Sequence, residues 1–427
     1  MADQMWRDLD PAERYFWLFD RLDPMNFVVI AELDRHIDVS GLGTALAEAQ
    51  ARHPLLRARL AVDDGRVAFA PTDAPLRMRV DTTTSSWRAA VADEFDDPLP
   101  LAEGPAARAR YLPLPHGRSV VLLTLHHVIA DGLAGVRLLQ RILRRLEGSD
   151  TLGPSEPVPP ALHERIPQSL RSARATLDVV AAVRAERQDL ASPHDFPAYS
   201  RASGGRRSRF DRIALAPAAV TELRARARAE GATVHGALAA AALQVTAEVF
   251  SAGFPSVVPL ASPIDLRRRS EPPIDDEAVV VAMGLLCTPY PVTADDHGAL
   301  ARRVTEQTHR EVGRGESHLF YRFARAASFA ADDDGFAAFA AMVEGAPKNL
   351  AVSNLGVVDA GGDPSWVHAV SPTLSPSPNQ LAFVAATTYG DRLLLNVATD
   401  RSKLDDAAAA SFLDRLAAAV GGEVEGG

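Results

Sequence analysis

The sequence predicts an α/β protein with two lobes of similar size. Its 427 residues are too many for one ordinary hydrophobic core and fit two domains of about 200 residues. Strand-like and helix-like segments recur in both halves, and between them, over residues 148–160, proline, glycine and acidic residues replace the periodic pattern. We therefore expect an N-terminal lobe over 1–150, a connector over 151–205 and a C-terminal lobe over 206–427, with a cleft between the lobes.

The first lobe begins with a predicted amphipathic helix over residues 11–22, which is rich in aromatic side chains and is followed by a strand over 27–33. A second helix over 40–52 starts with a good N-cap residue, and Pro54 stops it. The next predicted elements are strands over 56–62, 67–69, 108–112 and 120–125, and a helix over 133–146. The last of these strands has no polar alternation, which is typical of a strand buried on both faces.

A helix-like, alanine-rich connector over residues 162–190 leads to the second lobe. Pro217 lies in the first turn of a predicted helix that ends before Gly231, and Thr233 opens another helix. The remaining predicted elements are strands over 208–215, 256–263, 279–286, 349–352, 381–389 and 392–399, and a final helix over 405–420. Gly390 and Asp391 form a turn between the last two strands.

The composition is that of a folded globular protein, with 47% hydrophobic and 23% charged residues. A formal net charge of −10 argues against general nucleic-acid binding. Cys287 is the only cysteine, which excludes an intramolecular disulfide and a cysteine-based zinc site; we expect no metal site and a cytoplasmic location. The N-terminus lacks the apolar core of a secretory signal, and no run approaches the roughly 18 apolar residues of a membrane span.

The most informative segment joins the buried strand over 120–125 to the following helix and contains His126, His127, Asp131 and Gly132. Because successive side chains of a strand point to opposite faces, one histidine should face a cleft and the other the protein interior. A neutral imidazole is well suited to accept a proton near pH 7. Gly132 is expected to relieve a backbone position that a side chain would obstruct. The pattern predicts an active site with a histidine base.

Other interpretations of these residues remain open at this point. Paired histidines at a strand end are often structural, but the aspartate and glycine at a fixed offset favour the active-site interpretation here. From the spacing alone, Asp131 could orient the imidazole ring or hold the turn together through a cation elsewhere.

Several stretches of the chain, in order, resemble the superfamily of thioester-dependent acyltransferases. This superfamily includes chloramphenicol acetyltransferase, the condensation domains of nonribosomal peptide synthesis and polyketide-associated enzymes such as phthiocerol dimycocerosyl transferase. Besides the histidine motif, the similar stretches are Arg-His-Pro-Leu-Leu-Arg at 52–57, Leu-Ala-Glu-Gly-Pro at 101–105 and Pro-Ile-Asp-Leu-Arg at 263–267. The resemblance extends over nearly the whole chain and implies two chloramphenicol-acetyltransferase-like lobes with an active-site tunnel between them.

The resemblance also implies roles for individual residues. His127 would take the acceptor's proton as the acceptor attacks the thioester carbonyl directly, while His126 would be structural. The absence of a Gly-x-Ser-x-Gly segment agrees with a reaction that forms no acyl-enzyme. Asp131 would pair with an arginine across the site; Arg267 is the first candidate and Arg268 the second.

Ser353 and Asn354, ahead of Gly356, look similar to the Ser-Asn-x-Gly of the polyketide-associated branch. Either side chain could donate to the oxyanion that develops during acyl transfer, or both could simply cap a strand and form a turn. The chain has no Asp-Phe-Gly-Trp-Gly segment, which the plant branch of the superfamily would carry.

An arginine cluster after the connector could meet the acidic face of a carrier protein or the phosphates of coenzyme A. The arginine-rich composition favours a second interpretation, a solvated loop between the lobes. The cluster consists of Arg201, Arg206, Arg207, Arg209 and Arg212.

We therefore expect an acyltransferase that moves an acyl group from a coenzyme A or carrier-protein thioester to a hydroxyl acceptor, in secondary-metabolite or lipid tailoring. We expect the thioester to be a co-substrate, no cofactor to be bound and no carrier segment to be fused to either end, so that a carrier would dock in trans. Two alternatives remain. One is a freestanding condensation enzyme that forms an amide from an amine acceptor, which the same base would serve. The other is a non-catalytic carrier-binding module, against which the intact motif argues.

Overall fold

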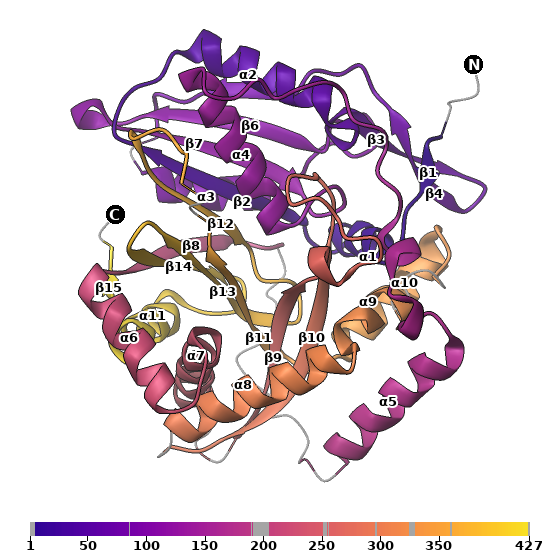
Figure 1. Cartoon of the computed structure of the whole chain (residues 1–427), viewed down its shortest axis with the longest axis vertical. Helices are drawn as coiled ribbons and strands as arrows, with labels where there is room; N and C mark the ends of the chain where they lie inside the picture. Colours follow the sequence, from indigo (N-terminus) through magenta and orange to yellow (C-terminus); the bar gives the residue numbers. More distant parts are fainter. Residues whose placement is uncertain are drawn as a thin grey trace.

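The computed structural model describes residues 5–84, 86–188, 190, 205–250, 254, 256–294, 297–323, 329–358 and 361–425. Two lobes lie one above the other in Figure 1, and each is built around a large sheet. The mixed α/β class and the two-lobed architecture agree with the sequence prediction.

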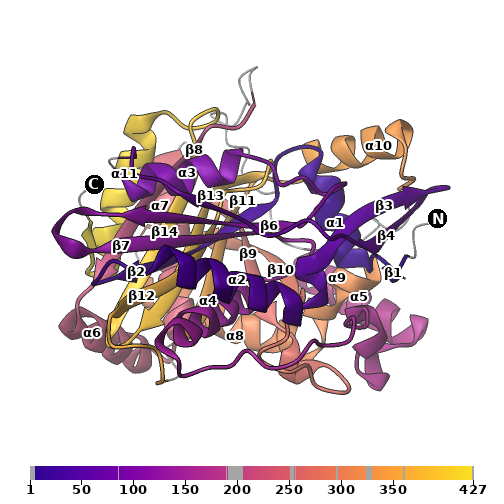
Figure 2. The same ribbon diagram turned by 90° about the horizontal axis from the view of Figure 1, so that it is seen from above.

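The first lobe contains a five-stranded and a three-stranded sheet. The larger has the order β12 (Val367–Leu374), β2 (Asn26–Leu33), β7 (Ser119–His126), β6 (Ala107–Pro113), β5 (Arg77–Val80). The smaller has the order β1 (Arg7–Asp8), β4 (Arg66–Pro71), β3 (Ala58–Asp63). The helices of this lobe are α1 (Pro11–Asp20), α2 (Val39–Arg52), α3 (Trp87–Asp96) and α4 (Gly132–Glu147). Figure 2 shows α3 on one face of the larger sheet and α2 with α4 on the other.

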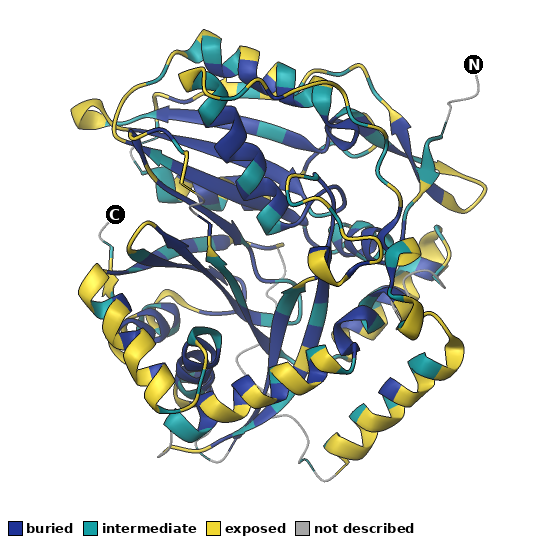
Figure 3. Ribbon diagram, in the orientation of Figure 1, coloured by how far each residue is buried: buried dark blue, intermediate teal, exposed yellow. Residues whose placement is uncertain are grey.

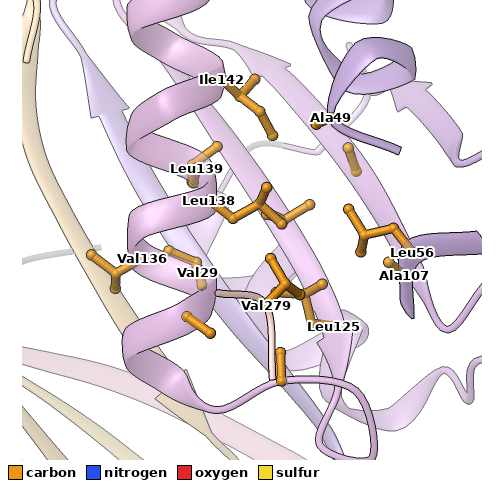
Figure 4. Close-up of a cluster of buried hydrophobic side chains, with 14 of the residues drawn as sticks. Val29, Ala49, Leu56, Ala107, Leu125, Val136, Leu138, Leu139, Ile142 and Val279 are labelled. Atoms are coloured by element: carbon orange, nitrogen blue, oxygen red, sulfur yellow. The ribbon is translucent and has the colours of Figure 1, made fainter. Parts of the chain in front are cut away.

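Helix α4 fixes the position of the histidine motif because it starts directly after it. Its apolar residues recur at helical spacing, so Leu139 and Ile142 pack with Val29 and Leu125 of the sheet (Figure 4). Each large aliphatic side chain buried in this way contributes about 1.5–3 kcal/mol. Gly135 permits this close packing, because a Cβ there would lie only 2.8 Å from Val29.

The second lobe is built on a seven-stranded sheet. Its order is β10 (Met283–Val292), β9 (Ser256–Asp265), β11 (Asn349–Val357), β13 (Gln380–Tyr389), β14 (Arg392–Asp400), β8 (Ser208–Leu215), β15 (Glu423–Val424). The helices that pack against this sheet in Figure 1 are α6 (Pro217–Ala229), α7 (Val234–Phe250), α8 (His297–Gly313) and α11 (Asp406–Val420). Strands β9, β11 and β13 are parallel, so their carboxyl ends lie at the same edge of the sheet, which meets the first lobe.

Three further helices lie at the side of the molecule. They are α5 (Ala173–Arg187), α9 (Leu319–Phe323) and α10 (Asp333–Glu344). Helices α9 and α10 contribute aromatic side chains that pack on Tyr15 and Phe19 of α1. Helix α5 belongs to the connector and is exposed along most of its length (Figure 3).

Strand β12 crosses from the second lobe to the first. It follows β11 in the sequence, but it pairs antiparallel with β2, with Ser371 opposite Ile30. One strand of the predicted C-terminal lobe over 206–427 therefore belongs to the sheet of the first lobe. The pairing covers the edge of β2, which would otherwise present unpaired backbone groups.

Three predicted strands differ from the observed ones. The strand predicted over 56–62 begins only at Ala58, because Pro54–Arg57 form a 3-10 turn. The strand predicted over 279–286 is displaced, because residues 279–282 run beside the histidine motif and β10 begins only at Met283. The strand predicted over 349–352 continues to Val357, because β11 keeps pairing with β13 as far as Thr388. The helices and strands that the sequence analysis missed are β1, β5, β12, β15, α3, α8, α9 and α10.

Arg212 links the two lobes through a buried polar network. Its side chain is 1% exposed; Nε donates to Asn396 Oδ1 over 2.8 Å and Nη2 donates to Ser371 Oγ over 3.1 Å. A second branch of the guanidinium pairs with Glu32 of β2. Because β8, β14, β12 and β2 all contribute, this network holds the crossover strand against both sheets.

The preferred interpretation of the arginine cluster as a solvated loop is wrong for two of its members. Arg206 and Arg212 are both buried and hydrogen-bonded. Arg209 pairs with a neighbouring aspartate over 2.6 Å, and Arg207 is exposed. Arg201 lies outside the described residues.

Within the described part of the chain, no single helix has the length and apolar character needed to cross a membrane. Helices α6 and α7 meet these two criteria only when taken together, and they are bent by 94° at the break between them.

Candidate active site

A cavity of 360 Å³ lies between the lobes, at the carboxyl end of β7. From the first lobe, its wall contains the histidine motif together with the aromatic side chains of α1 and β2. From the second lobe, the wall contains β9, β10, β11 and β13. Most of the lining is apolar, which suits an uncharged ligand with few polar groups.

His126 is fully buried and lies on the side of the strand that faces the interior. The backbone N–H of Val128 donates to its Nδ1 over 2.9 Å, so the ring proton lies on Nε2, 2.9 Å from Asp20 Oδ1. Burial raises the pKa of Asp20, but His126 and the Met25 backbone N–H outweigh that effect and hold it below its usual value. Asp20 is the last residue of α1, so this contact fixes α1 beside the motif.

His127 points the other way and lines the cavity. Its Nδ1 lies 3.0 Å from the backbone carbonyl of Ala130, and since a carbonyl can only accept, Nδ1 carries the proton and Nε2 carries the lone pair. The ring stacks on Phe16, with centroids 4.1 Å apart and planes inclined by 2°, and also contacts Phe27. The tautomer and the orientation of the ring are therefore both set before any ligand binds.

The environment of His127 favours the neutral imidazole. Burial lowers the pKa of His127 to about 4, and the charge of Asp131 offsets only part of this effect. At neutral pH the ring is therefore in the form that can accept a proton.

We expect two consequences of this low pKa. If His127 is the base, kcat/KM should be constant across neutral pH and fall as the pH drops through about 4.

The same low pKa affects stability. The pKa of His127 in the folded protein lies below the ordinary value of 6.5, so the contribution of the neutral ring to the free energy of unfolding is complete above pH 6.5 and is lost as the pH falls towards 4. Urea unfolding of the parent and of His127→Gln at several pH values measures this. If the free energy of unfolding had the same pH dependence in both proteins, the low pKa of His127 would be contradicted.

Asp131 pairs with Arg267, the first candidate from the sequence. The pair is bidentate, with Arg267 Nη1 2.9 Å from Asp131 Oδ2 and Nη2 3.0 Å from Oδ1. Asp131 also caps α4 by accepting from the Ala134 N–H over 2.9 Å, and it accepts from the Ala282 N–H over 2.8 Å. The second candidate, Arg268, is exposed and pairs with Asp276 instead. Asp131 thus accepts from the Arg267 guanidinium and from two backbone N–H groups, whereas the His127 ring is oriented by the Ala130 carbonyl.

The electrostatics of this pair follow from its burial. Burial alone would raise the pKa of Asp131, but the Arg267 charge and the hydrogen bonds to the carboxylate hold it below its usual value. Burial likewise acts to lower the pKa of Arg267, and the charge of Asp131 more than offsets this. Both groups therefore remain ionised between the lobes.

The expectation for Gly132 is wrong. A Cβ at this position would lie 3.7 Å from Leu355 and from Pro372, which is ordinary van der Waals contact rather than obstruction. The contact does show that the carboxyl end of β11 and the crossover strand β12 both reach the motif.

Ser353 and Asn354 both line the cavity, but inside β11 rather than at its end. Side chains alternate along a strand, so Ser353 shares a face with Ala351, which also lines the cavity. Asn354 Oδ1 accepts from the Gly356 N–H over 3.0 Å, and Gly356 has a φ of 72°. Asn354 therefore has the local turn role through Oδ1, while its Nδ2 and the Ser353 hydroxyl both remain candidate donors to a reacting group.

Sequence reasoning missed two features of the site. Asp20, the partner of His126, lies more than a hundred residues away and no local pattern marks it. The aromatic wall beside His127 comes largely from Tyr15, Phe16 and Phe19 of α1. The aromatic content of the predicted helix was the available signal for this wall. Among the described residues, no group of three or more His, Cys, Asp or Glu side chains is arranged to hold a metal ion.

Solved structures with this architecture cover nearly the whole chain. Polyketide synthase associated protein 5 from Mycobacterium tuberculosis is 18% identical, with a TM-score of 0.66, over 98% of this chain and 99% of that one. A trichothecene 15-O-acetyltransferase from Fusarium sporotrichioides is 12% identical, with a TM-score of 0.72, over 97% and 94%. The first condensation domain of the CDA synthetase is 16% identical, with a TM-score of 0.68, over 98% of each chain. At these identities the likeness establishes the fold.

Curated relatives match over shorter stretches. Chondramide synthase cmdD from Chondromyces crocatus is 31% identical over 134 residues, which are 28% of this chain and 3% of that protein. Phosphinothricin tripeptide synthetase PhsB from Streptomyces viridochromogenes is 27% identical over 158 residues, which are 34% of this chain and 13% of that protein. This chain thus spans only a small part of the length of either relative.

The family assignment comes from the second lobe. Residues 204–417, half of the chain, match the family model described as phthiocerol/phthiodiolone dimycocerosyl transferase C-terminus. The same lobe carries Arg267 and Ser353, and it closes the cavity that contains His127. The chain therefore belongs to the phthiocerol/phthiodiolone dimycocerosyl transferase family.

Proposed function

We propose that the protein transfers an acyl group from a thioester of coenzyme A or a carrier protein to a hydroxyl acceptor. The acceptor oxygen forms a bond to the thioester carbonyl carbon while His127 Nε2 takes the hydroxyl proton. The carbon–sulfur bond then breaks and the proton passes from His127 to the departing thiolate, giving an ester and a free thiol. The observation that carries the proposal is the His127 ring, which lines the cavity with its proton held on Nδ1 by the Ala130 carbonyl.

A hydroxyl acceptor fits the charges around the cavity better than an amine does. An amine is mostly protonated at neutral pH, and burying an ammonium group without a counter-charge is costly. Among the described residues that line the cavity, the two carboxylates are Asp131 and Asp265, and both contact Arg267. The similar trichothecene 15-O-acetyltransferase is named for transfer to oxygen, which supports the same choice.

The setting is part of the same proposal. The thioester is a co-substrate, no cofactor is bound, and a carrier protein, where one is the donor, docks in trans. The reaction belongs to cytoplasmic secondary-metabolite or lipid tailoring; the similarity to a chondramide synthase and a tripeptide synthetase supports this setting.

Ser353 is proposed to donate its hydroxyl to the oxyanion of the tetrahedral intermediate. Loss of one such donor lowers kcat by about 10²- to 10³-fold, so we expect Ser353→Ala to reduce kcat by that factor with little change in KM. Steady-state kinetics measure the split. The matched control is Ser377→Ala, which removes a cavity-lining hydroxyl from the loop that follows β12. Equal effects of the two substitutions on kcat would remove Ser353 from the mechanism.

The test of the function follows thiol release from acyl-coenzyme A and from acyl-carrier thioesters in the presence of a panel of alcohols and amines. We expect release that depends on an alcohol, with an ester as the product by mass spectrometry. Products that are amides only would replace this function by condensation. Binding of the carrier protein without any thiol release would replace this function by that of a non-catalytic carrier-binding module.

A further inference from the structure

Two side-chain oxygen atoms buried on the cavity wall have no hydrogen-bond partner among the described residues. They are Asn349 Oδ1 and Thr373 Oγ1; the two residues are 4% and 2% exposed. Buried polar groups in folded proteins are almost always paired, because an unpaired group loses its hydration without compensation. Unpaired groups on the wall of a binding cavity therefore point to a partner supplied by the ligand.

The orientation of Asn349 leaves its carbonyl oxygen for that partner. Its Nδ2 donates to the backbone carbonyl of Asn379 over 3.2 Å, and since a carbonyl accepts only, the amide cannot be turned the other way. Asn349, Ala351 and Ser353 alternate with Leu350 and Val352, which pack in the core behind the sheet. The side chain of Asn349 thus lies on the face of β11 that lines the cavity.

Asn349 lies at the end of the cavity remote from the histidine motif. The other end of β11 reaches the motif, where Leu355 lies beside Gly132. Ser353 is four positions after Asn349 on the strand, which corresponds to about 13 Å, or about twelve bonds of an extended chain.

The wall between these two ends is apolar. Ala261, Ala351, Phe383 and Ala385 form a buried cluster there, and Leu285 packs against it. This stretch provides few polar groups to a ligand that passes along it.

We propose that this arm of the cavity binds an extended, mainly apolar chain that carries a hydrogen-bond donor at the Asn349 end while its reacting end lies at His127. The donor is a hydroxyl or an amide N–H, which Asn349 Oδ1 accepts; the Thr373 hydroxyl is the second unpaired group that the same wall offers to the chain. The inference rests on the proposed function. Two substrates offer this chemistry: an acceptor with a second hydroxyl far from the reacting one, and the pantetheine arm of the thioester donor.

The experiment measures two preferences in the parent protein and its variants. For acceptors, kcat/KM is compared between straight-chain α,ω-diols and monoalcohols of equal length, from octyl to tetradecyl. For donors, it is compared between acyl-coenzyme A and the same acyl group on a simple alkanethiol without amides. In at least one of these two pairs, we expect the parent to prefer the compound with the additional hydrogen-bond donor, that is, the diol or the acyl-coenzyme A. Asn349→Leu should reduce that preference by about tenfold.

Thr373→Val should reduce the same preference, and Thr387→Val is its matched control. Thr387 lies on β13 with a buried hydroxyl that also has no partner in the described part of the chain, but it does not line the cavity. Loss of the diol preference alone identifies the acceptor as the ligand, and loss of the coenzyme A preference alone identifies the pantetheine arm. Alcohol-dependent transfer with neither preference, or preferences that Asn349→Leu leaves intact, would overturn the inference and spare the proposed function. No alcohol-dependent transfer at all would overturn both.

Discussion

Replacing His127 by alanine is expected to lower kcat/KM by about 10²- to 10⁴-fold, the range that a positioned general base contributes. The ring offers a basic nitrogen lone pair, on Nε2, to the cavity, because its Nδ1 proton is engaged by the Ala130 carbonyl. Its removal also takes away the stacking contact with Phe16, so thermal unfolding must show that the variant is still folded. Added imidazole should restore part of the lost rate, because the vacated space adjoins the cavity.

The control for this variant is His163→Ala, which removes an exposed imidazole from the connector and is expected to leave kcat/KM unchanged. Rescue by imidazole separates loss of the base from loss of packing, since packing alone would not restore proton transfer. A folded His127→Ala protein with the parent rate would show that this ring is not the base.

The histidine motif was predictable because its signals are local. The apolar run before it specifies a buried strand, and alternation along that strand separates buried His126 from His127 on the cavity wall. The apolar spacing after Gly132 specifies α4. The pairing of Arg267 with Asp131 was predictable for a similar reason. Arg267 follows β9 almost directly, and the carboxyl ends of the parallel strands lie at the edge of the sheet that meets Asp131.

The crossover strand was not predictable in the same way. Its sequence, Val367–Leu374, includes Pro372, which cannot donate to a ladder and weakens a strand pattern. What makes it a strand is pairing with β2, more than three hundred residues earlier in the sequence. The contact between Asp20 and His126 is likewise set by the tertiary fold.

Two other differences had signals in the sequence. Helix α8 buries Leu300, Ala301 and Val304, which follow helical spacing within an otherwise polar segment. The role of glycine in the motif was assigned to Gly132, whereas the tight packing occurs at Gly135, one turn further along α4. A pattern locates a helix, but which of its glycines contacts a strand depends on how the helix packs.

Replacing Arg267 by methionine is expected to lower the free energy of unfolding by about 3–5 kcal/mol. The Arg267 side chain is 1% exposed and that of Asp131 is 5% exposed, so the substitution leaves a carboxylate buried between the lobes without its cation. Urea unfolding measures the loss. Arg268→Met is the matched control, since Arg268 is the next residue but is 83% exposed, and we expect a change of less than about 0.5 kcal/mol.

A second substitution separates the effect of charge from that of packing. Asp131→Asn keeps a side-chain oxygen that can accept from the Ala134 N–H and cap α4, but it removes the carboxylate charge. By itself it leaves Arg267 with Asp265 as its remaining carboxylate partner, so it should also be destabilising. The double variant Asp131→Asn/Arg267→Met contains no buried charge at this place, and we expect it to be more stable than Arg267→Met alone. If it were less stable, the loss would come from the missing arginine contacts, and charge pairing would not be what joins the lobes beside His127.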